Sequence, residues 1–321
     1  MKVIVTGGMG FIGSHLVKEL MKSKIKVITI DNSEQYFDKI DLSYYKKIEY
    51  RKKYLLKGSK NYHINLNAPH LVYEILNREK PEYVVHLAAL PLANIAIDNR
   101  HLAMEGIFNS TYNLLESLTT LKKFKKFVYV SSSMIYGDFK KNPQTEDDTI
   151  LDPKDIYGSL KACGELLTKA YFKNYKLPIN IVRPSAVYGP TDCNRRVLQN
   201  FVEHSIAGKK LTIYDGQSTN LDFTYVKDIA RAIHDVLLKG KTGDTYNATF
   251  GNSRSILDAF EIIKKLNPKT KVEFKKNKEN FRPKRGTLDI EKIKKIGFAP
   301  KYNLEKGLKE YYNFQKKFIN K

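Results

Sequence analysis

The sequence predicts an α/β fold, in which a doubly wound parallel sheet carries a smaller, mixed α/β lobe. Over residues 1–183, short runs rich in β-branched residues alternate with amphipathic segments of helical period. Strands that alternate with helices pair in parallel, so the sheet needs helices on both faces. From Pro184 onward, turn signals become frequent and the elements become short. We therefore expect a first domain over residues 1–183 and a second lobe over residues 184–321, with some later elements returning to the first domain.

The N-terminal segment has the pattern of a dinucleotide-binding turn. A strand over residues 2–6 runs into Gly7, Gly10 and Gly13, and an amphipathic helix follows before a second strand that ends on Asp31. In a Rossmann-type domain the first glycine allows the tight turn, the second lets the backbone approach a pyrophosphate, and the third lets the helix pack on the strand. The N–H groups at the helix N-terminus bind the phosphates. Asp31 is placed to accept hydrogen bonds from both hydroxyls of the adenosine ribose and to repel a 2′-phosphate, so the pattern predicts NAD rather than NADP.

The remaining elements follow in alternation after a tyrosine-rich stretch at 32–60, which we interpret as a loop with a short helix. Strands are expected at residues 61–66, 83–87, 127–131 and 179–183. Helices are expected at residues 70–78, 101–121 and 156–175, and in the second lobe near residues 196–207, 226–238, 256–266 and 304–318. The binding site of such a sheet lies at the carboxyl ends of its strands. We therefore expect it where Gly7, Asp31, Ala88 and Ser132 follow their strands, with the small side chains of Ala88 and Ala89 letting the backbone lie against a cofactor.

Composition favours a cytoplasmic globular protein. The formal net charge is +22 at pH 7, but the lysines are spread over many positions rather than gathered in one stripe. We expect a solvated basic surface that attracts a small anionic substrate, rather than a nucleic acid, although an anionic partner such as RNA stays open. No run approaches the roughly 18 apolar residues of a membrane helix, and a strand that begins at residue 2 leaves no room for a signal peptide. Cys163 and Cys193 fit no metal-ligand spacing and suit a reducing compartment, and we expect Cys163 in the core.

Tyr157 and Lys161 form a Y-x-x-x-K pattern on the helix expected at 156–175. Residues four apart share a helix face, so the Lys161 ammonium is expected beneath the Tyr157 phenol. A free tyrosine has a pKa of about 10, and action as a base near pH 7 needs a fall of roughly three units, or about 4 kcal/mol. A neighbouring ammonium and a positive nicotinamide ring together provide such a shift. The pattern is common by itself, and it gains meaning because it follows the dinucleotide-binding turn and a fifth strand that ends in serines.

These motifs resemble those of the extended short-chain dehydrogenase/reductases, and among them the NAD-dependent nucleotide-sugar epimerase/dehydratase family. The resemblance covers essentially the whole chain. It is carried by TGGMGFIGSH at 6–15, Asp31, HLAA at 86–89, SSSMIYG at 131–137, Tyr157 with Lys161, RPSAVYGP at 183–190, LDFTYVKD at 221–228 and RGTLD at 285–289.

The resemblance implies NAD as cofactor, a nucleotide sugar as substrate and three catalytic residues. By the family pattern, Ser132 hydrogen-bonds the sugar hydroxyl or ketone, Tyr157 removes the hydroxyl proton, and Lys161 lowers the tyrosine pKa and holds the nicotinamide ribose. Asn65 and Leu66 match the pair that contacts adenine, although the family usually has Asp at the first of these positions. The cofactor-binding residues expected are Gly7, Gly10, Phe11, Ile12, Gly13, Asp31, Asn32, Asn65, Leu66, Leu87, Ala88, Ala89, Tyr157 and Lys161. The helices at 101–121 and 156–175 resemble those through which relatives pair, which implies a homodimer.

Several positions depart from the family pattern. Family 4,6-dehydratases have Asp-Glu after the catalytic hydroxyl, as acid and base for the elimination of water, whereas this chain has Ser133 and Met134. Ala186 replaces an asparagine that usually touches the substrate diphosphate, Leu221 stands where an arginine often binds it, and Ile107 replaces a common asparagine near the site. We expect Ser133, Arg196 and Arg285 to bind the substrate, with Arg195 and Arg282 as further candidates for its phosphates.

The sequence thus favours an NAD-dependent nucleotide-sugar epimerase that acts at C4 of a UDP-hexose through a transient 4-keto sugar. A C4 dehydrogenase or ketoreductase that uses the same three catalytic residues stays open, and a 4,6-dehydratase is less favoured. An inactive NAD-binding protein that binds a partner through its basic surface is the least favoured alternative. The sequence identifies neither the nucleotide nor the sugar nor the oligomeric state.

Overall fold

A seven-stranded parallel sheet forms the centre of the molecule. The structure is a computed structural model that describes residues 1–36, 42–147, 151–214, 220–276 and 283–319. Within these residues the strand order is β11-β6-β5-β4-β1-β2-β3, and every neighbouring pair is parallel. The strands are β1 (Lys2–Thr6), β2 (Lys26–Asp31), β3 (Lys60–His63), β4 (Tyr83–His86), β5 (Lys126–Val130), β6 (Ile179–Pro184) and β11 (Thr245–Ala248). The predicted α/β class with a doubly wound parallel sheet is confirmed.

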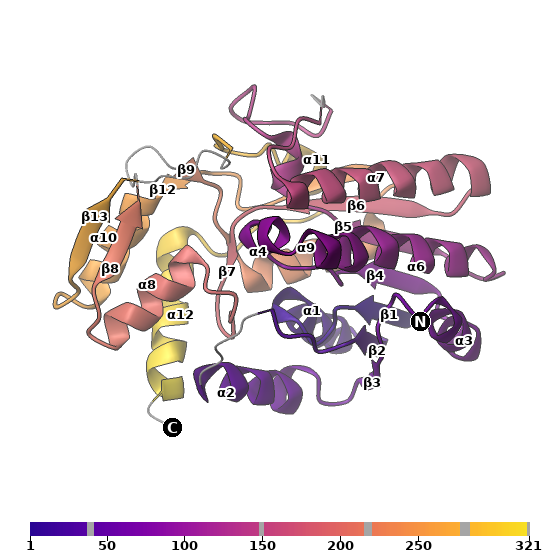
Figure 1. Cartoon of the computed structure of the whole chain (residues 1–321), viewed down its shortest axis with the longest axis horizontal. Coiled ribbons are helices and arrows are strands. Elements are labelled where there is room, and N and C mark those ends of the chain that lie inside the picture. The colour runs from indigo at the N-terminus through magenta and orange to yellow at the C-terminus, as the bar shows by residue number, and fades with distance from the viewer. Residues whose placement is uncertain (37–41, 148–150, 215–219, 277–282, 320–321) are drawn as a thin grey trace.

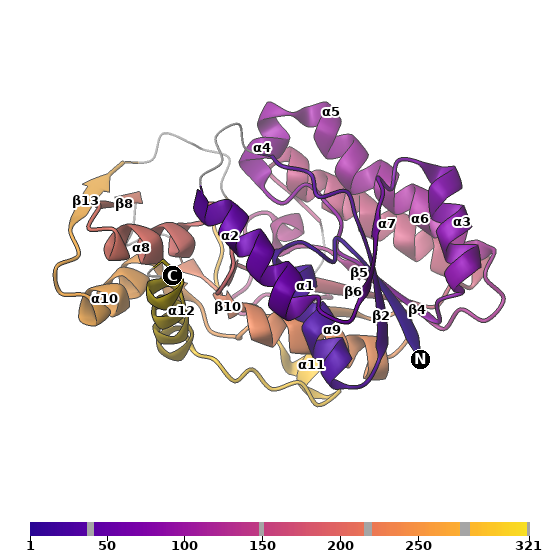
Figure 2. The ribbon, with the colours of Figure 1, turned by 90° about the horizontal axis from the view of Figure 1, so that it is seen from below.

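Helices cover both faces of this sheet, as Figure 1 and Figure 2 show. One face carries α1 (Phe11–Lys22), α9 (Val226–Lys239) and α11 (Glu291–Lys294). The other face carries α3 (Pro69–Glu79), α6 (Ser110–Thr119) and α7 (Ile156–Tyr175). Between β2 and β3 the chain forms α2 (Leu42–Tyr50) and a π-helical segment, η1 (Arg51–Leu55), which packs against α1.

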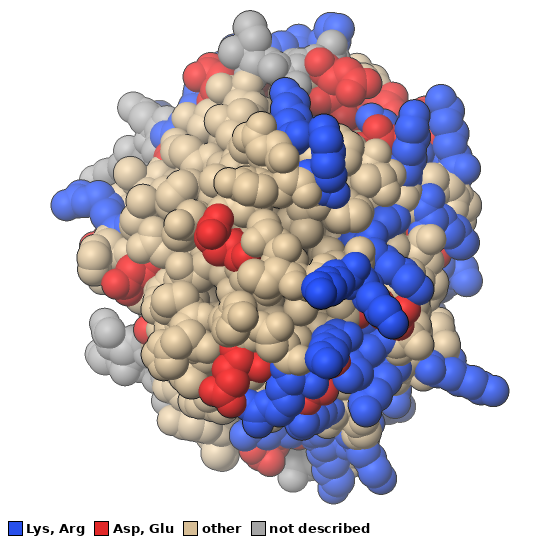
Figure 3. Space-filling model, turned by 90° about the vertical axis from the view of Figure 1, so that its right-hand side faces the viewer, with Lys and Arg blue, Asp and Glu red and all other residues tan. Residues whose placement is uncertain are grey.

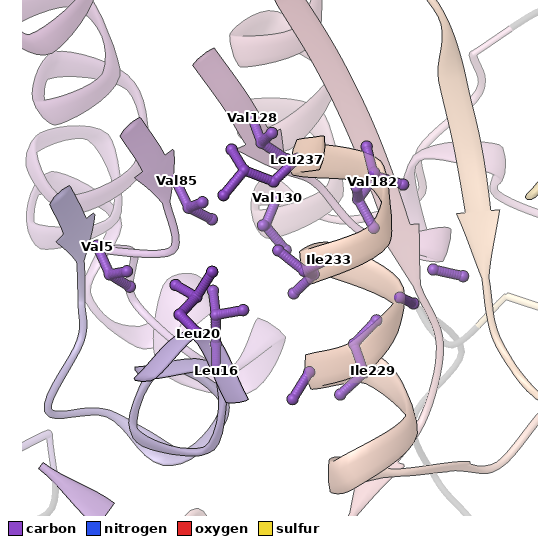
Figure 4. Close-up of a cluster of buried hydrophobic side chains, with 14 of the residues drawn as sticks. Val5, Leu16, Leu20, Val85, Val128, Val130, Val182, Ile229, Ile233 and Leu237 are labelled. Carbon is purple, nitrogen blue, oxygen red and sulfur yellow. The ribbon is translucent and has the colours of Figure 1, made fainter. Parts of the chain in front are cut away.

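The core on the α1 face is built from aliphatic side chains of the strands and of two helices. Valines of the four central strands point toward leucines and isoleucines of α1 and α9. Figure 4 labels ten residues of this cluster: Val5, Val85, Val128, Val130, Val182, Leu16, Leu20, Ile229, Ile233 and Leu237. None of the ten is more than 4% exposed. In β5, Val128 and Val130 face this cluster whereas Phe127 and Tyr129 face the other core, because successive side chains of a strand point to opposite faces.

A second unit lies to the left of the sheet in Figure 1. It contains α8 (Val197–Ile206), α10 (Ile256–Leu266), α12 (Leu304–Ile319), β8 (Leu211–Tyr214), β9 (Asn220–Leu221), β12 (Arg254–Ser255) and β13 (Val272–Lys275). β13 pairs with β8 in parallel, and β12 pairs with β9 antiparallel. Its core includes Phe201, Phe260 and Leu308. The short strand β7 (Val187–Tyr188) pairs with β10 (Thr224–Tyr225) and leads from the sheet into this unit.

The second half of the chain also contributes to the central sheet. α9, which the sequence analysis assigned to the second lobe, packs against α1, and β11 pairs with β6 at the edge of the sheet. Elements beyond residue 184 therefore belong to both units, and the division of the chain between residues 183 and 184 stays a prediction.

The helix predicted at 101–121 differs most from the structure. This region forms α5 (Arg100–Ala103), a π-helical segment η2 (Met104–Asn109) and then α6. A short helix, α4 (Ala93–Asp98), precedes it and was not predicted, because six residues are too few to show a 3.6-residue period. The π-helical turn places Glu105 and Gly106 at the wall of the cleft described below, and such turns often lie at functional sites.

Basic and acidic side chains are interleaved on the surface. On the face shown in Figure 3, Lys and Arg gather toward one side, and Asp and Glu lie among them. Near the amino ends of the strands, Lys2 and Lys60 both pair with Glu79, and Lys125 pairs with Glu82. The hydrogen bond from Lys60 is the main cause that lowers the Glu79 pKa to about 2. Part of the positive charge is therefore compensated locally.

Candidate active site

An open cleft with a volume of about 1140 Å³ lies at the carboxyl ends of β1, β2, β4 and β5. Leu221 and Phe223 of the second unit form part of its wall. The structure brings every residue that the sequence analysis assigned to cofactor, catalysis or substrate to this one cleft: Gly7, Gly10, Phe11, Ile12, Gly13, Asp31, Asn32, Asn65, Leu66, Leu87, Ala88, Ala89, Ser132, Ser133, Tyr157, Lys161, Arg196 and Arg285. These residues come from the ends of several strands and from both units.

The glycine turn fits a bound dinucleotide. Gly7 has a φ of +66°, which disfavours other residues, and a Cβ there would lie 2.6 Å from the backbone nitrogen of Ala88. A Cβ at Gly13 would collide with the carbonyl oxygen of Gly7. Helix α1 begins after Gly10, which provides no side-chain cap. Its first N–H groups therefore lack the partner that a cap would supply and suit a phosphate.

Asp31 closes the far side of this turn. Its carboxylate accepts hydrogen bonds from the backbone N–H groups of Met9, at 2.9 Å, and Ser33, at 2.8 Å. Burial raises the Asp31 pKa, and these two hydrogen bonds oppose that rise. Each carboxylate oxygen has a second lone pair, so the group remains able to accept hydrogen bonds from ribose hydroxyls.

The catalytic candidates meet at the start of α7. Asp155 caps this helix by accepting a hydrogen bond from the N–H of Gly158 at 2.8 Å, and Tyr157 stands in the first turn. The Ser132 hydroxyl lies near the Tyr157 phenol and acts to lower its pKa, and the Ser132 oxygen accepts a hydrogen bond from the Met134 N–H at 3.2 Å. One turn later, the Lys161 ammonium donates to the carbonyl oxygen of Val130 at 2.9 Å. Tyr157, Ser132 and Lys161 thus face one end of the cleft together.

The charges around these groups differ from the expectation for Tyr157. Burial lowers the Lys161 pKa to about 8, against a partial opposing effect of Glu165. Burial raises the Tyr157 pKa, and the groups that oppose this rise are the Arg196 guanidinium and the Ser132 hydroxyl. The Lys161 ammonium is directed to a backbone carbonyl, and Arg196 is the cation that acts on the phenol here. The lowering of the Tyr157 pKa by Lys161 together with a nicotinamide ring stays a prediction.

A buried ion pair fixes α7 against the sheet. Arg183 of β6 donates to both carboxylate oxygens of Glu165, at 2.9 and 2.7 Å, and neither side chain is more than 1% exposed. Arg183 also donates to the Tyr136 hydroxyl at 2.8 Å, next to η3 (Ser133–Tyr136). The two segments that carry Tyr157 and Ser132 are therefore held to the same strand.

The candidates for substrate binding come from two loops. Arg196 donates to the carbonyl oxygen of Pro91 at 3.3 Å and pairs with Asp192 at 3.7 Å. Arg285 lines the cleft. Burial raises the Asp155 pKa, and Arg285 is among the groups that oppose this rise, which places it near the start of α7. Arg195 also lines the cleft, whereas Arg282 lies outside the described residues.

The departures from the family pattern have defined places. Ser133, Met134, Ala186 and Leu221 line the cleft. Ile107 is fully buried in an apolar cluster with Leu90 and Ala103. Met134, Ala186 and Leu221 therefore leave the cleft wall without the hydrogen-bonding side chains of the family pattern.

Sequence analysis missed several residues of the cleft wall. Tyr36, Tyr44 and Arg51 come from the stretch interpreted as a loop with a short helix, and Cys193 comes from the loop after β7. Arg51 is 3% exposed, and no feature of the sequence marked it as buried among the many lysines. Cys163, expected in the core, is exposed.

Within the described residues, no three His, Cys, Asp or Glu side chains are grouped so that they could hold a metal ion. No helix in the same part of the chain combines the length and the apolar character that crossing a membrane requires.

Comparison with known proteins identifies the family. The model of the NAD dependent epimerase/dehydratase family matches residues 3–249. The chain belongs to this family. Its members are NAD-dependent enzymes, which agrees with the glycine turn and Asp31.

Individual relatives of this family member include both epimerases and dehydratases. The chain is similar to the UDP-glucose 4-epimerase of Thermotoga maritima, with a TM-score of 0.89 and 26% identity over 99% of this chain and 100% of that one. It is similar to the UDP-glucuronic acid 4-epimerase of Bacillus cereus, with a TM-score of 0.88 and 28% identity over 99% of each chain. The human dTDP-D-glucose 4,6-dehydratase is 28% identical over 96% of this chain and 88% of its own length.

A longer relative shows a different organisation. A trifunctional UDP-glucose 4,6-dehydratase, epimerase and reductase of Arabidopsis thaliana is 27% identical over 96% of this chain. The chain spans 46% of the length of that relative.

Proposed function

We propose that this protein is an NAD-dependent nucleotide-sugar epimerase that inverts C4 of a UDP-hexose through a transient 4-keto sugar. The observation that carries the proposal is that Tyr157, Ser132 and Lys161 line the same cleft as the glycine turn, with the Ser132 hydroxyl acting on the Tyr157 phenol. Ser133 and Met134, in the same wall, decide between the reactions of the family.

The three catalytic residues have separate tasks. Tyr157 takes the proton of the C4 hydroxyl as the ketone forms and returns it when the alcohol is restored. Ser132 hydrogen-bonds the same oxygen, so the oxygen is held as its charge changes. NAD bound at the glycine turn supplies hydride chemistry at C4. Lys161, fixed by the carbonyl of Val130, is proposed to hold the nicotinamide ribose.

An epimerase fits the cleft better than a dehydratase does. Elimination of water requires an acid and a base near C5 and C6. Ser133 and Met134 offer neither a carboxylate nor a carboxylic acid at pH 7. The relatives include enzymes of both kinds, so the proposal depends on these two residues and not on overall similarity.

The substrate side favours a nucleotide diphosphate. Arg196 and Arg285 place two guanidinium groups at the cleft wall, and arginine suits bidentate phosphate binding. Two of the solved relatives are named for complexes with UDP-glucose and with UDP-glucuronic acid, which supports UDP as the nucleotide. We propose residues 184–321 as the part that supplies most of these contacts.

We also propose a cytoplasmic homodimer that binds no nucleic acid. Support for self-association comes from large side chains exposed on α6 and α7, namely Tyr112 at 47%, Leu166 at 59% and Tyr175 at 62%. Acidic residues interleaved with the lysines disfavour a continuous polyanion site.

Proton NMR in deuterated water tests the proposed activity. The purified enzyme with NAD is incubated with UDP-, GDP- and dTDP-hexoses. We expect inversion at C4 of one UDP-hexose, without deuterium uptake and without a lasting change in absorbance at 340 nm. Deuterium at C5 with loss of water indicates a dehydratase, and a stoichiometric absorbance change indicates a C4 dehydrogenase or ketoreductase. Either result contradicts the proposal.

A further inference from the structure

The loop at residues 189–196 carries two of the candidate substrate arginines, Arg195 and Arg196. It joins β7 to α8, and its last four residues, 193–196, all line the cleft. Thr191 and Arg195 have left-handed backbone conformations, with φ of +69° and +54°. Such conformations are unfavourable for these residue types, so surrounding contacts must hold the loop in place.

These contacts come from three buried basic side chains in the first 51 residues of the chain. Each donates to the carbonyl oxygen of one of three consecutive loop residues: His15 to Pro190 at 3.1 Å, Arg51 to Thr191, and Lys47 to Asp192 at 2.7 Å. The three side chains are 8%, 3% and 1% exposed. Burial lowers the His15 pKa to about 3, so this imidazole is neutral near pH 7 and donates through Nε2.

Arg51 differs from the other two because it also contacts the dinucleotide turn. One of its terminal nitrogens donates to the carbonyl oxygen of Met9 at 3.2 Å. The Met9 N–H in turn donates to Asp31. The other terminal nitrogen of Arg51 donates to Thr191 and to the Cys193 sulfur, the latter at 3.1 Å. A single guanidinium therefore joins the glycine turn to the loop with Arg195 and Arg196.

We propose that Arg51 is a positioning residue that couples the dinucleotide turn to the loop at 189–196, so that binding of NAD and of the nucleotide sugar strengthen each other. That the second ligand is a nucleotide sugar rests on the proposed function. NAD that fixes the turn at Met9 also fixes the Arg51 guanidinium, which holds the loop through Thr191. By thermodynamic linkage, the loop held in its binding conformation then favours NAD to the same extent.

The coupling needs an arginine at this position. The planar guanidinium has separate N–H groups at fixed angles, and these reach two carbonyl oxygens of different segments at once. A lysine at residue 51 offers one ammonium and cannot keep both contacts in the same geometry. Arg51→Met removes both contacts and keeps the length of the side chain, and Lys52→Met is the matched control, since Lys52 is adjacent and 51% exposed.

Alkylation of Cys193 by iodoacetamide reports on the loop without a sugar substrate. A Cys163→Ser background removes the exposed thiol of α7. We expect saturating NAD to slow alkylation of Cys193 about tenfold in the protein with Arg51 and in the Lys52→Met control. In the Arg51→Met variant we expect NAD to slow it less than twofold. Steric shielding by NAD alone would persist in Arg51→Met, so equal protection in both proteins overturns the proposal.

Affinity for UDP, measured by calorimetry, tests the coupling of NAD binding to nucleotide binding. We expect NAD to raise the affinity for UDP about tenfold in the wild type and less than twofold in Arg51→Met, with Arg51→Lys between them. An NAD effect that survives in Arg51→Met overturns the coupling. If the wild type binds no UDP, the proposed function fails, and the alkylation measurement still decides the role of Arg51. If Arg51→Met does not fold, Arg51→Lys takes its place in both measurements, and a wild-type response to NAD in that variant overturns the proposal.

Discussion

The two sides of the cleft are built in different ways. The cofactor side consists of backbone, glycines and small residues at the ends of parallel strands, where Gly7 approaches Ala88 and Gly13 approaches Gly7. The substrate side consists of long side chains on two loops, with Arg196 held by Asp192 and Pro91. A cofactor shared by a large family is therefore expected at a site whose geometry tolerates little change, whereas the proposed substrate site consists of side chains that substitution can replace.

Tyr157 lines the cleft between these two sides of the proposed site, and its loss should have the largest effect. Tyr157→Phe removes the proton acceptor but keeps the ring, so we expect kcat to fall about 1000-fold, or about 4 kcal/mol, with NAD affinity within threefold. The rate of C4 inversion measures the fall in kcat, and the melting temperature in the presence of NAD reports on NAD binding. A variant that keeps more than a tenth of the activity would show that another group moves the proton.

A single methyl group should damage the cofactor side. Gly13→Ala brings a Cβ against the Gly7 carbonyl and within 2.8 Å of the Gly8 Cα. We expect NAD affinity to fall at least 100-fold, or about 2.7 kcal/mol. Gly208→Ala is the control, because its Cβ meets no atom within 4 Å; its φ of +68° costs about 1 kcal/mol of stability without changing NAD affinity. Normal NAD binding by Gly13→Ala would contradict the close packing described here.

The buried Lys161 ammonium should lower the free energy of unfolding of the protein at pH 7. Its folded pKa of about 8 lies below the ordinary value of about 10.4, so the unfolded chain holds this proton more tightly between these pH values. The free energy of unfolding should therefore rise with pH from about 8 to 10.4. Lys161→Met should remove that rise and stabilise the protein at pH 7 by about 1 to 2 kcal/mol, while activity is lost.

Denaturant unfolding at pH 7 and pH 10 measures the effect of Lys161→Met. Lys173 is exposed on the same helix. Lys173→Met should change the free energy of unfolding at neither pH by more than about 0.5 kcal/mol. If Lys161→Met is less stable at pH 7 and keeps the rise, burial of the ammonium is not costly and the argument fails.

Substitution of an arginine on the substrate side should have a smaller effect on activity. Arg196→Met should raise KM about tenfold, or about 1.4 kcal/mol, and leave NAD affinity within twofold. Because Arg196 helps to hold down the Tyr157 pKa, the acidic limb of the kcat/KM profile should also move to higher pH. Arg254→Met, at an ion pair with Glu305 outside the cleft, should alter neither quantity. An unchanged KM in Arg196→Met would remove Arg196 from the substrate site.

The difference between the two sides also explains what the sequence could predict. The strands, the glycine turn, Asp31 and the helix of Tyr157 and Lys161 depend on residues close in sequence, and the structure places them as expected. Arg51, Lys47 and His15 act on residues 140, 145 and 175 positions away. No local pattern specifies such partners, so these residues resembled ordinary surface charges of a basic protein. The rise of the Tyr157 pKa was not predicted either, because it comes from burial of the phenol, which tertiary packing decides; Arg196, on a distant loop, opposes that rise.

The central claim is that C4 is oxidised and reduced within one cleft, without release of the hydrogen to solvent. The most direct test uses the UDP-hexose identified by NMR, carrying deuterium at C4, in ordinary water. We predict that both C4 epimers at equilibrium retain the deuterium at C4, and that Tyr157→Phe forms almost no second epimer. Loss of the label to solvent, or a 4-keto-6-deoxy product with the label at C6, would contradict the account.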